Sequence, residues 1–250
     1  MTRASVCIAT YNGEKFLSEQ LDSIMLQIGA LDEIIVVDDG SKDRTFDILR
    51  GYKDHRIKLY VNEKNVGACA TFEKAINLAR GKHIILSDQD DIWIDGRLEK
   101  MCAALDEKPG LISSNFCCVN TDGEPIVISA LPSLKADQSL NHNSNIVRLF
   151  FGKMQYFGSA MAFSAQLKEI LLPFPKYVEA HDHWIAIAAN LSQLNRHLED
   201  ITLKRRIHSN NLSHANRKLS AKLYSRLIFI RQSYELLRRI RFNNRHVNDM

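Results

Sequence analysis

Short aliphatic and β-branched runs alternate with segments of helical spacing through the first half of the chain. The apolar runs predict four strands, at Val6–Ala9, Glu33–Val37, Ile57–Val61 and His83–Leu86. Between them, apolar residues recur every three or four positions, which predicts helices around 16–28, 46–49 and 72–79. Strands that alternate with helices are typical of an α/β fold with a mostly parallel sheet covered by helices.

The second half has a less regular pattern. Leu111–Val119 and Ile126–Ile128 flank the turn signal Asp122-Gly123 and predict a hairpin. We also predict a strand at Gly158–Phe163 and a helix at His181–Leu194, whose first residues face back toward the carboxyl ends of the strands.

A long amphipathic helix is predicted near the C-terminus, from about residue 216 to residue 240. Its apolar positions are spaced by threes and fours, at Leu219, Leu223, Leu227, Ile230, Tyr234, Leu237 and Ile240. From Lys204 onward the acidic residues are Glu235 and Asp249, against many Lys and Arg, so this segment is strongly basic. We therefore expect a catalytic domain at residues 1–215 and a basic amphipathic helical tail at residues 216–250.

The composition is that of a globular protein. The chain has 250 residues, of which 45% are hydrophobic and 25% charged, enough for one sizeable core. The first apolar run is too short for a secretory signal, and no stretch reaches the roughly 18 apolar residues that cross a bilayer. We therefore expect a cytoplasmic protein, with its five cysteines reduced because they lack CxxC spacing.

The tail predicts contact with a surface. Leu, Ile and Tyr at helical spacing favour packing on the domain or on a homodimer partner, and the Arg-rich face is available to lipid headgroups at the inner face of the cytoplasmic membrane. We expect no nucleic acid partner, because the tail lacks interleaved exposed aromatic residues and the chain contains no nucleic-acid motif.

Polar residues collect directly after three of the predicted strands, at Thr10–Gly13, Asp38–Asp43 and Asp88–Asp91. In an open α/β sheet, ligands bind at the carboxyl ends of the strands. We therefore expect the functional site at this edge.

Two acidic segments at this edge each allow two interpretations. Asp88-Gln89-Asp90-Asp91 places three carboxylates within four residues, and their mutual repulsion favours a Mn²⁺ or Mg²⁺ ion that also binds phosphate oxygens. The alternative is a solvated turn with a helix cap, for which Asp95 is suited. Asp38-Asp39 could accept hydrogen bonds from a base or a ribose, or could form a turn that caps the next helix.

Four segments together resemble the family 2 glycosyltransferases of the GT-A fold: Ala9-Thr10-Tyr11-Asn12-Gly13, Val37-Asp38-Asp39-Gly40-Ser41, Asn65-Val66-Gly67 and Ser87-Asp88-Gln89-Asp90-Asp91-Ile92-Trp93. Their order and spacing are similar to the bacterial rhamnosyltransferase-like branch of O-antigen and capsule biosynthesis. The sequence departs from that branch at Asp95-Gly96-Arg97 and at Ala68-Cys69-Ala70-Thr71, near donor-contacting loops, so the donor stays open.

The resemblance implies roles for particular residues. The substrate-binding residues would be Thr10, Tyr11, Asn12, Asp38, Asp39, Asp88, Gln89, Trp93, Gly158 and Arg206. The metal ligands would be Asp90, in the DxD motif of the family, and His208. Asp182, in Ala180-His181-Asp182-His183-Trp184, would be the catalytic base, and the alternative for it is a helix cap. An inverting transfer needs such a carboxylate, because the acceptor hydroxyl loses its proton as it attacks the anomeric carbon.

The function implied is that of an inverting, metal-dependent hexosyl- or rhamnosyltransferase. It would move a sugar from a nucleoside-diphosphate-sugar, a UDP- or dTDP-sugar, to a saccharide acceptor, in many members lipid-linked, in O-antigen, lipopolysaccharide or capsule biosynthesis. A sugar nucleotidyltransferase is one alternative, although Thr10–Gly13 lacks the glycine-rich basic loop that cradles a triphosphate. The other is a non-catalytic nucleotide-sugar-binding subunit, against which the retention of Asp88, Asp90 and Asp182 argues.

Overall fold

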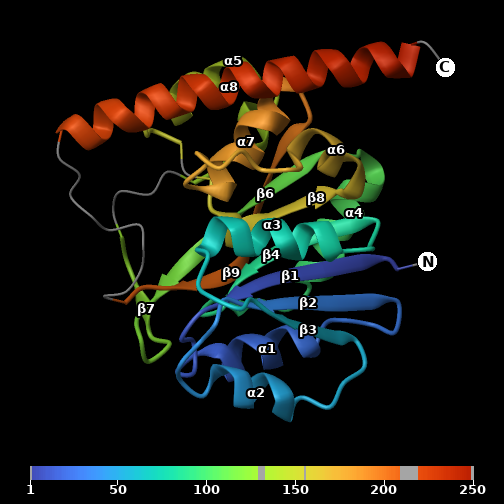
Figure 1. Ribbon diagram of the computed structural model, residues 1–250, viewed down its shortest axis with the longest axis vertical. Coiled ribbons are helices and arrows are strands. Elements are labelled where there is room, and N and C mark those ends of the chain that lie inside the picture. The colour runs from blue at the N-terminus through green and yellow to red at the C-terminus, as the bar shows by residue number, and fades with distance from the viewer. Residues whose placement is uncertain (1, 129–132, 155, 209–218, 249–250) are drawn as a thin grey trace.

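The first half of the protein forms a four-stranded parallel sheet (Figure 1). Its strands are β1 (Ala4–Thr10), β2 (Asp32–Asp38), β3 (Ile57–Val61) and β4 (His83–Asp88), in the order β3-β2-β1-β4. Ala9 lies opposite both Val37 and Asp88, so β1, β2 and β4 end at the same edge. The computed structural model, which describes residues 2–128, 133–154, 156–208 and 219–248, thus has every strand predicted for this half.

Helices follow these strands where apolar spacing predicts them. They are α1 (Leu17–Met25), α2 (Thr45–Gly51) and α3 (Ala68–Leu78), followed by α4 (Arg97–Glu107) after the short strand β5 (Ile92–Trp93). The N-terminal flank of α4 is Gly96 in a left-handed conformation, and no side chain caps this helix. The capping role considered for Asp95 is therefore not observed.

The second half extends the sheet with β6 (Leu111–Val119), β8 (Met161–Ser164) and β9 (Asn195–Arg206), in the order β4-β8-β6-β9-β5. Strand β8 is antiparallel to both neighbours, whereas β9 is parallel to β6 and antiparallel to β5. The predicted hairpin is present, because β7 (Pro125–Ile126) pairs with the end of β6. The sheet is therefore mixed, and the parallel strands β1, β2 and β4 all end at its polar edge.

The remaining elements of this half are short. They are the 3₁₀ turns Ala136–Gln138, Gly158–Ala160 and Ala165–Leu167 and the helices α5 (His142–Phe150), α6 (Lys168–Leu171) and α7 (His181–Leu191). The strand predicted at Gly158–Phe163 was wrong at its start, because its first three residues form a 3₁₀ turn in which the Ala160 amide donates to the Phe157 carbonyl. The helix predicted at His181–Leu194 is confirmed as α7, although it ends three residues earlier.

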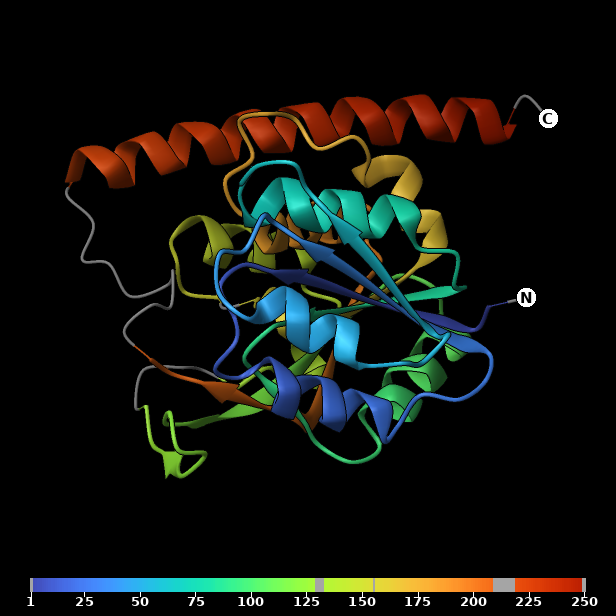
Figure 2. The ribbon, with the colours of Figure 1, turned by 60° about the horizontal axis from the view of Figure 1, so that its bottom comes forward.

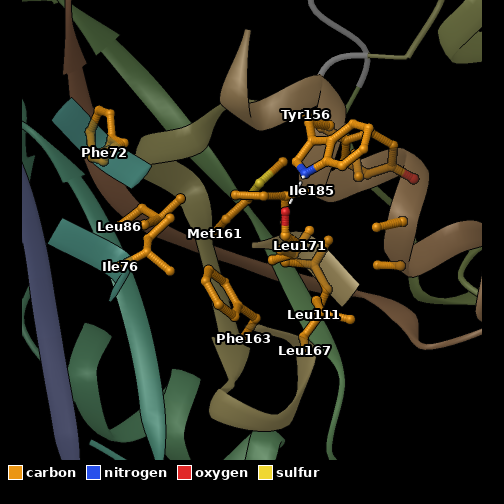
Figure 3. Close-up of a cluster of buried hydrophobic side chains, with 14 of the residues drawn as sticks. Phe72, Ile76, Leu86, Leu111, Tyr156, Met161, Phe163, Leu167, Leu171 and Ile185 are labelled. Atoms are coloured by element: carbon orange, nitrogen blue, oxygen red, sulfur yellow. Dashed lines mark hydrogen bonds between the residues drawn. The ribbon is translucent and has the colours of Figure 1, made fainter. Parts of the chain in front are cut away.

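The two faces of the sheet are covered by separate apolar clusters. On one face, α1 and α4 bury aliphatic side chains such as Leu21 and Leu98 in a cluster with residues of β1, β2, β4, β6 and β8, and α4 contacts the last three of these strands. On the other face, α3 packs on β1 and β2, and α6 and α7 complete a cluster that includes residues of β4, β6 and β8. Figure 3 shows this second cluster, in which Phe72 and Ile76 face Leu86 and Met161. Side chains from both halves of the chain share it, which joins them into one core.

The C-terminal segment forms the long helix α8 (Leu219–Asn248), which lies across α6 and α7 (Figure 1). It buries Phe229, Gln232 and Leu236, and the Arg239 guanidinium donates hydrogen bonds to the carbonyls of Ile170, Leu171 and Pro173. The helix therefore packs on its own domain, as expected.

The side of α8 that packs is not the predicted one. The predicted apolar stripe is exposed, at Leu223, Leu227, Ile230, Tyr234 and Leu237. A different side of α8 packs on α6 and α7, because Arg239 donates to a carbonyl of α6 and lies over the Trp184 ring of α7. The apolar residues on that side are Phe229 and Leu236. The predicted boundary between residues 215 and 216 lies outside the described residues.

Two sequence expectations concern the whole chain. All five cysteines are free thiols, as expected. Over the described residues, no helix combines the length and the apolar character needed to cross a bilayer, and this includes the long helix α8.

Candidate active site

An acidic cluster follows β4 at the carboxyl edge of the sheet. One carboxylate oxygen from each of Asp88, Asp90 and Asp91 lies within 4.8 Å of the others. Burial, together with the neighbouring charges of Asp91 and Asp90, raises the pKa of Asp88 well above its usual range. Burial and the charge of Asp90 likewise raise the pKa of Asp91 to about 6. The end of the strand thus concentrates negative charge at a half-buried edge, where Asp91 is buried and Asp88 and Asp90 are partly exposed.

The two oxygens of Asp91 differ in their partners. Oδ1 accepts a hydrogen bond of 3.0 Å from the Arg206 amide. Oδ2 is buried and, within the described part of the chain, makes no hydrogen bond of good geometry, although the nearby Ser159 hydroxyl offsets part of the rise in the Asp91 pKa. A buried carboxylate oxygen without a partner is costly, so this oxygen suits a cation or a donor from a ligand.

The two predicted metal ligands lie together. His208 Nε2 is 2.7 Å from Asp90 Oδ2, and both side chains are mostly buried. The imidazole stacks on Phe16, with 5.3 Å between ring centroids. Residues from opposite ends of the chain thus meet beside the acidic cluster.

Arg206 has a structural position in place of the predicted contact with substrate. Its side chain is 2% exposed, and its guanidinium donates to the carbonyls of Asp90, Asn120 and Thr121 and to the Glu19 carboxylate. These bonds fix the acidic turn to β9. The assignment of Arg206 to diphosphate binding stays a prediction, and in the structure carbonyls and Glu19 engage this side chain.

The neighbouring Arg205 is the cation that acts on the cluster. Its charge lowers the pKa values of both Asp88 and Asp91 and so partly offsets their rise. Its guanidinium lies over the Phe157 ring, 4.2 Å from the centroid. Successive residues of a strand point to opposite faces, but the sequence alone does not tell which of the two arginines faces the site.

The loop after β1, which contains the first segment of the family resemblance, is held by hydrogen bonds within the protein. Thr10 and Asp38 are both buried, and the Thr10 hydroxyl donates to Asp38 at 3.0 Å. Asp38 also accepts from the Ser41 amide and hydroxyl. Asn12 has a positive φ of 48°, and its side-chain oxygen accepts from the Lys42 amide. The loops after β1 and β2 therefore support each other.

Asp39 organises the loop before α3. Its carboxylate accepts hydrogen bonds from the amides of Val66 and Gly67 and from the Asn62 side chain. Gly67 begins this turn with a φ of 90°, which favours glycine. The third segment of the family resemblance, Asn65-Val66-Gly67, is thus held in position by the Asp39 carboxylate.

Gln89 and Tyr11 join the two loops at the edge. The Gln89 side chain accepts from the Tyr11 amide and donates to the Tyr11 carbonyl, a pairing that fixes the backbone at this point. Tyr11 is 44% exposed, so, together with the exposed Asn12, it presents a side chain of the first segment to solvent.

Trp93 lies in the core. It is 4% exposed, its indole nitrogen donates to Ser87 at 3.1 Å, and the Arg97 guanidinium stacks on its ring. Its assignment as a substrate-binding residue stays a prediction, and in the structure the ring is buried where β5 pairs with β9.

Asp182 is the half-buried second residue of α7. It lies close enough to Asp88 to raise the pKa of that carboxyl further. Its Oδ1 accepts a 2.7 Å hydrogen bond from the His183 amide, and no side chain caps α7. The cap considered for Asp182 is thus not observed, and its carboxylate lies near enough to the acidic cluster for its charge to act on Asp88.

Gly158 and His181 pack tightly beside this carboxylate. A Cβ on Gly158 would lie 2.4 Å from His181 Nε2, so the turn requires glycine. The His181 ring stacks on Phe72 at 4.1 Å, and burial lowers its pKa. Gly158, a predicted substrate-binding residue, therefore lies beside His181, the residue before Asp182.

Three further residues lie near the site: Arg205, Ser159 and Cys69. The sequence offers Arg205 as an alternative to Arg206 for the diphosphate, and it places Ser159 beside the predicted Gly158. Burial, together with the charges of Glu73 and Asp182, raises the pKa of Cys69, whose nearness to the site the sequence does not indicate.

Comparison with known proteins agrees with this geometry. A family model described as glycosyl transferase family 2 matches residues 5–163. The uncharacterized glycosyltransferase MJ1057 of Methanocaldococcus jannaschii is 31% identical over 88% of this chain and 76% of its own length. The UDP-Glc:alpha-D-GlcNAc-diphosphoundecaprenol beta-1,3-glucosyltransferase WfgD of Escherichia coli is 32% identical over 56% of this chain, and the match spans 53% of its length.

Solved structures share the fold. TarS 1-349 of S. aureus in complex with UDP has a TM-score of 0.68 and 22% identity, over 92% of this chain and 65% of that chain. The mannosyltransferase PcManGT of Pyrobaculum calidifontis, in complex with GDP-Man and Mn²⁺, has a TM-score of 0.60 and 21% identity, over 84% of this chain and 58% of that chain. These likenesses confirm the predicted GT-A fold. With the family model matching well over half of its length, the chain belongs to glycosyl transferase family 2.

Proposed function

We propose that the protein is an inverting, metal-dependent hexosyl- or rhamnosyltransferase of cell-surface polysaccharide biosynthesis. It would take a sugar from a UDP- or dTDP-sugar and transfer it to a saccharide acceptor. The observation that supports this most directly is the cluster of Asp88, Asp90 and Asp91 at the carboxyl edge, with Asp182 beside it.

The acidic cluster fits a divalent cation. The unpaired Asp91 Oδ2 and the raised pKa values of Asp88 and Asp91 both indicate negative charge that the described side chains do not fully neutralise. Asp90 and His208 would hold the ion, since Mn²⁺ accepts imidazole as well as carboxylate and Mg²⁺ prefers carboxylate. When bound, the ion would stabilise the negative charge of the leaving nucleoside diphosphate.

Asp182 is the proposed catalytic base. It accepts the proton of the acceptor hydroxyl while that oxygen bonds to the anomeric carbon and the bond to the diphosphate oxygen breaks on the opposite face. The hydrogen bond from the His183 amide orients its carboxylate. Burial and the charges of Asp91 and Asp90 raise the pKa of Asp88 most, and the charge of Asp182 adds a smaller rise that reflects its proximity. An acceptor bound between Asp182 and the acidic cluster would lie between the base and the donor sugar.

The substrate classes rest on relatives. The names of TarS and PcManGT structures record UDP and GDP-Man, and that of WfgD records a UDP-glucose donor and a diphosphoundecaprenol-linked acceptor. These names support a nucleoside-diphosphate-sugar donor and a lipid-linked saccharide acceptor for this chain. A lipid-linked acceptor also places the reaction at the inner face of the cytoplasmic membrane.

The test is transfer by the purified full chain. We expect release of nucleoside diphosphate from a UDP- or dTDP-sugar with Mn²⁺ or Mg²⁺, and an increase when a diphosphoundecaprenol-linked sugar is added. Asp182→Asn should lower turnover by about 10²- to 10⁴-fold with donor affinity nearly unchanged, because only the proton acceptor is lost. Glu179→Gln is the matched control, since that exposed carboxylate lies three residues before Asp182.

Other outcomes assign other functions. Loss of donor binding in Asp182→Asn would give Asp182 a structural role. Pyrophosphate release from a nucleoside triphosphate and a sugar phosphate would identify a nucleotidyltransferase. Donor binding without hydrolysis or transfer to any acceptor would identify a binding subunit.

A further inference from the structure

Helix α8 presents a row of apolar side chains to solvent. Leu223, Leu227, Ile230, Tyr234 and Leu237, together the α8 stripe, are between 38% and 72% exposed. A contiguous exposed apolar row is costly in water and marks a surface that contacts a partner.

The geometry of α8 directs this stripe away from the protein. At about 100° per residue, the stripe falls on one side of the helix, nearly opposite the buried Phe229 and Leu236. Val147 and Phe151, at the C-terminal end of α5, are also exposed and line a groove with Ile230, Tyr234 and Leu237. The apolar surface therefore extends from α8 to α5.

The charge around the stripe is positive. The α8 sequence has seven Lys and Arg and one Glu, a net charge of +6, whereas the whole chain has +4, so the other 220 residues together carry −2. The single acid, Glu235, is paired with Arg238 and Arg239. Helix α5 contains no acidic residue. This surface therefore fits a partner that offers anionic groups to the flanking cations and an apolar region to the stripe.

A second copy of the chain would fit poorly. Arg226 flanks the stripe on one side, and Arg231 and Arg238 flank it on the other. If two α8 helices paired through their stripes, these arginines would face the same arginines of the other copy, and like charges at such flanking positions oppose pairing. Charge complementarity thus favours an anionic partner.

The position of α8 suits a flat surface. In Figures 1 and 2 the helix lies along one outer edge of the molecule, and the rest of the described chain lies on one side of it. A 30-residue helix is about 45 Å long, so its stripe is a straight line of apolar contact. Amphipathic helices with cationic flanks lie in the plane of anionic bilayers in this way.

We propose that the α8 stripe binds the surface of an anionic lipid bilayer. Its leucine, isoleucine and tyrosine side chains enter the acyl boundary, while the flanking cations contact lipid phosphates. The proposal stands apart from the proposed chemistry, since none of these side chains belongs to the candidate active site.

The test is flotation of the full chain with vesicles. We expect binding to phosphatidylcholine vesicles that contain phosphatidylglycerol, weak binding to pure phosphatidylcholine, and weaker binding as salt rises. Leu227→Ser/Ile230→Ser/Tyr234→Ser should lower the affinity by about ten-fold or more, because apolar side chains no longer enter the acyl boundary. Leu26→Ser/Leu31→Ser is the matched control, since these exposed leucines lie far from α8 near α1.

A second variant tests the contribution of the cations on α8. Lys222→Gln/Arg238→Gln should weaken binding by about five-fold for each cation removed, and the control Lys53→Gln/Lys108→Gln should not. Unchanged donor binding and melting temperature show that each variant is folded. Equal binding to both vesicle types, or binding to neither, overturns the proposal, and so does a concentration-dependent dimer that the serine variant dissociates.

Discussion

Hydrogen bonds separate the carboxylates that hold the fold from those available to a ligand. Asp39 accepts three hydrogen bonds and positions the loop before α3. Asp91, in contrast, has a buried oxygen that no described donor of good geometry reaches. Both residues end or follow a strand at the same edge. Their different roles therefore follow from the donors around them rather than from residue type.

A buried histidine predicts how stability depends on pH. His197 Nδ1 lies 2.9 Å from the Lys135 carbonyl and Nε2 lies 2.9 Å from the Tyr156 hydroxyl, an arrangement that suits the neutral ring. Burial lowers its pKa in the folded state. The folded form then binds fewer protons than the unfolded one, so the stabilisation is complete above the unfolded pKa near 6.5 and declines as pH falls through it.

We expect chemical denaturation to show a falling free energy of unfolding between pH 7.5 and 5.5. His197→Gln should make this decline shallower, by at most about 1.4 kcal/mol per pH unit for one proton. His55→Gln is the control, because that side chain is 89% exposed. A decline as steep in His197→Gln as in the wild type would contradict the assignment.

The sequence located the acidic site but not every partner within it. Asp88, Asp90 and Asp182 could be named because a local motif carries each of them. The choice between Arg205 and Arg206 could not be made, since it depends on which face of β9 meets the acidic turn. The burial of Trp93 could not be predicted either, because it depends on the pairing of β5 with β9.

At the scale of the element, α8 has two apolar sides with different fates. Phe229 and Leu236 pack on the domain, while the α8 stripe stays exposed. Sequence spacing identified an apolar row but not which row the domain covers, because that depends on the surface that α6 and α7 present.

Adjacent leucines of α8 test this assignment. Leu236 is 0% exposed and Leu237 is 38% exposed. Leu236→Ala should lower the free energy of unfolding by about 2–5 kcal/mol, because it leaves a cavity in the core. Leu237→Ala should change it by about 0.5 kcal/mol or less. Equal losses in chemical denaturation of the two variants would show that α8 packs on another side.

Strand β9 shows why the second half of the fold was harder to predict. It is twelve residues long and rich in charged side chains, so it lacks the apolar run that marks a strand. Its charges are satisfied by distant groups, as when Arg196 donates to the carbonyls of Ala104 and Lys108. The first half was predictable because each strand there contains an apolar run, which is buried in β1, β2 and β4 and half-buried in the edge strand β3.

At the scale of the whole molecule, the mixed sheet brings together groups that are far apart in sequence. Strand β4 carries the acidic cluster, β9 brings His208 beside Asp90, and α7 brings Asp182 beside Asp88. The fold thus assembles a candidate metal site and a candidate base at one edge. The central claim is that this edge binds a nucleoside diphosphate through a divalent ion.

Calorimetric titration of UDP into the full chain, with Mn²⁺ and then with excess chelator, tests this claim most directly. The account predicts binding that chelation abolishes and that Asp90→Ala weakens by about ten-fold or more. The control Asp95→Asn, at an exposed carboxylate between β5 and α4, should leave binding unchanged. Equal affinity in wild type and Asp90→Ala, with or without Mn²⁺, would contradict it.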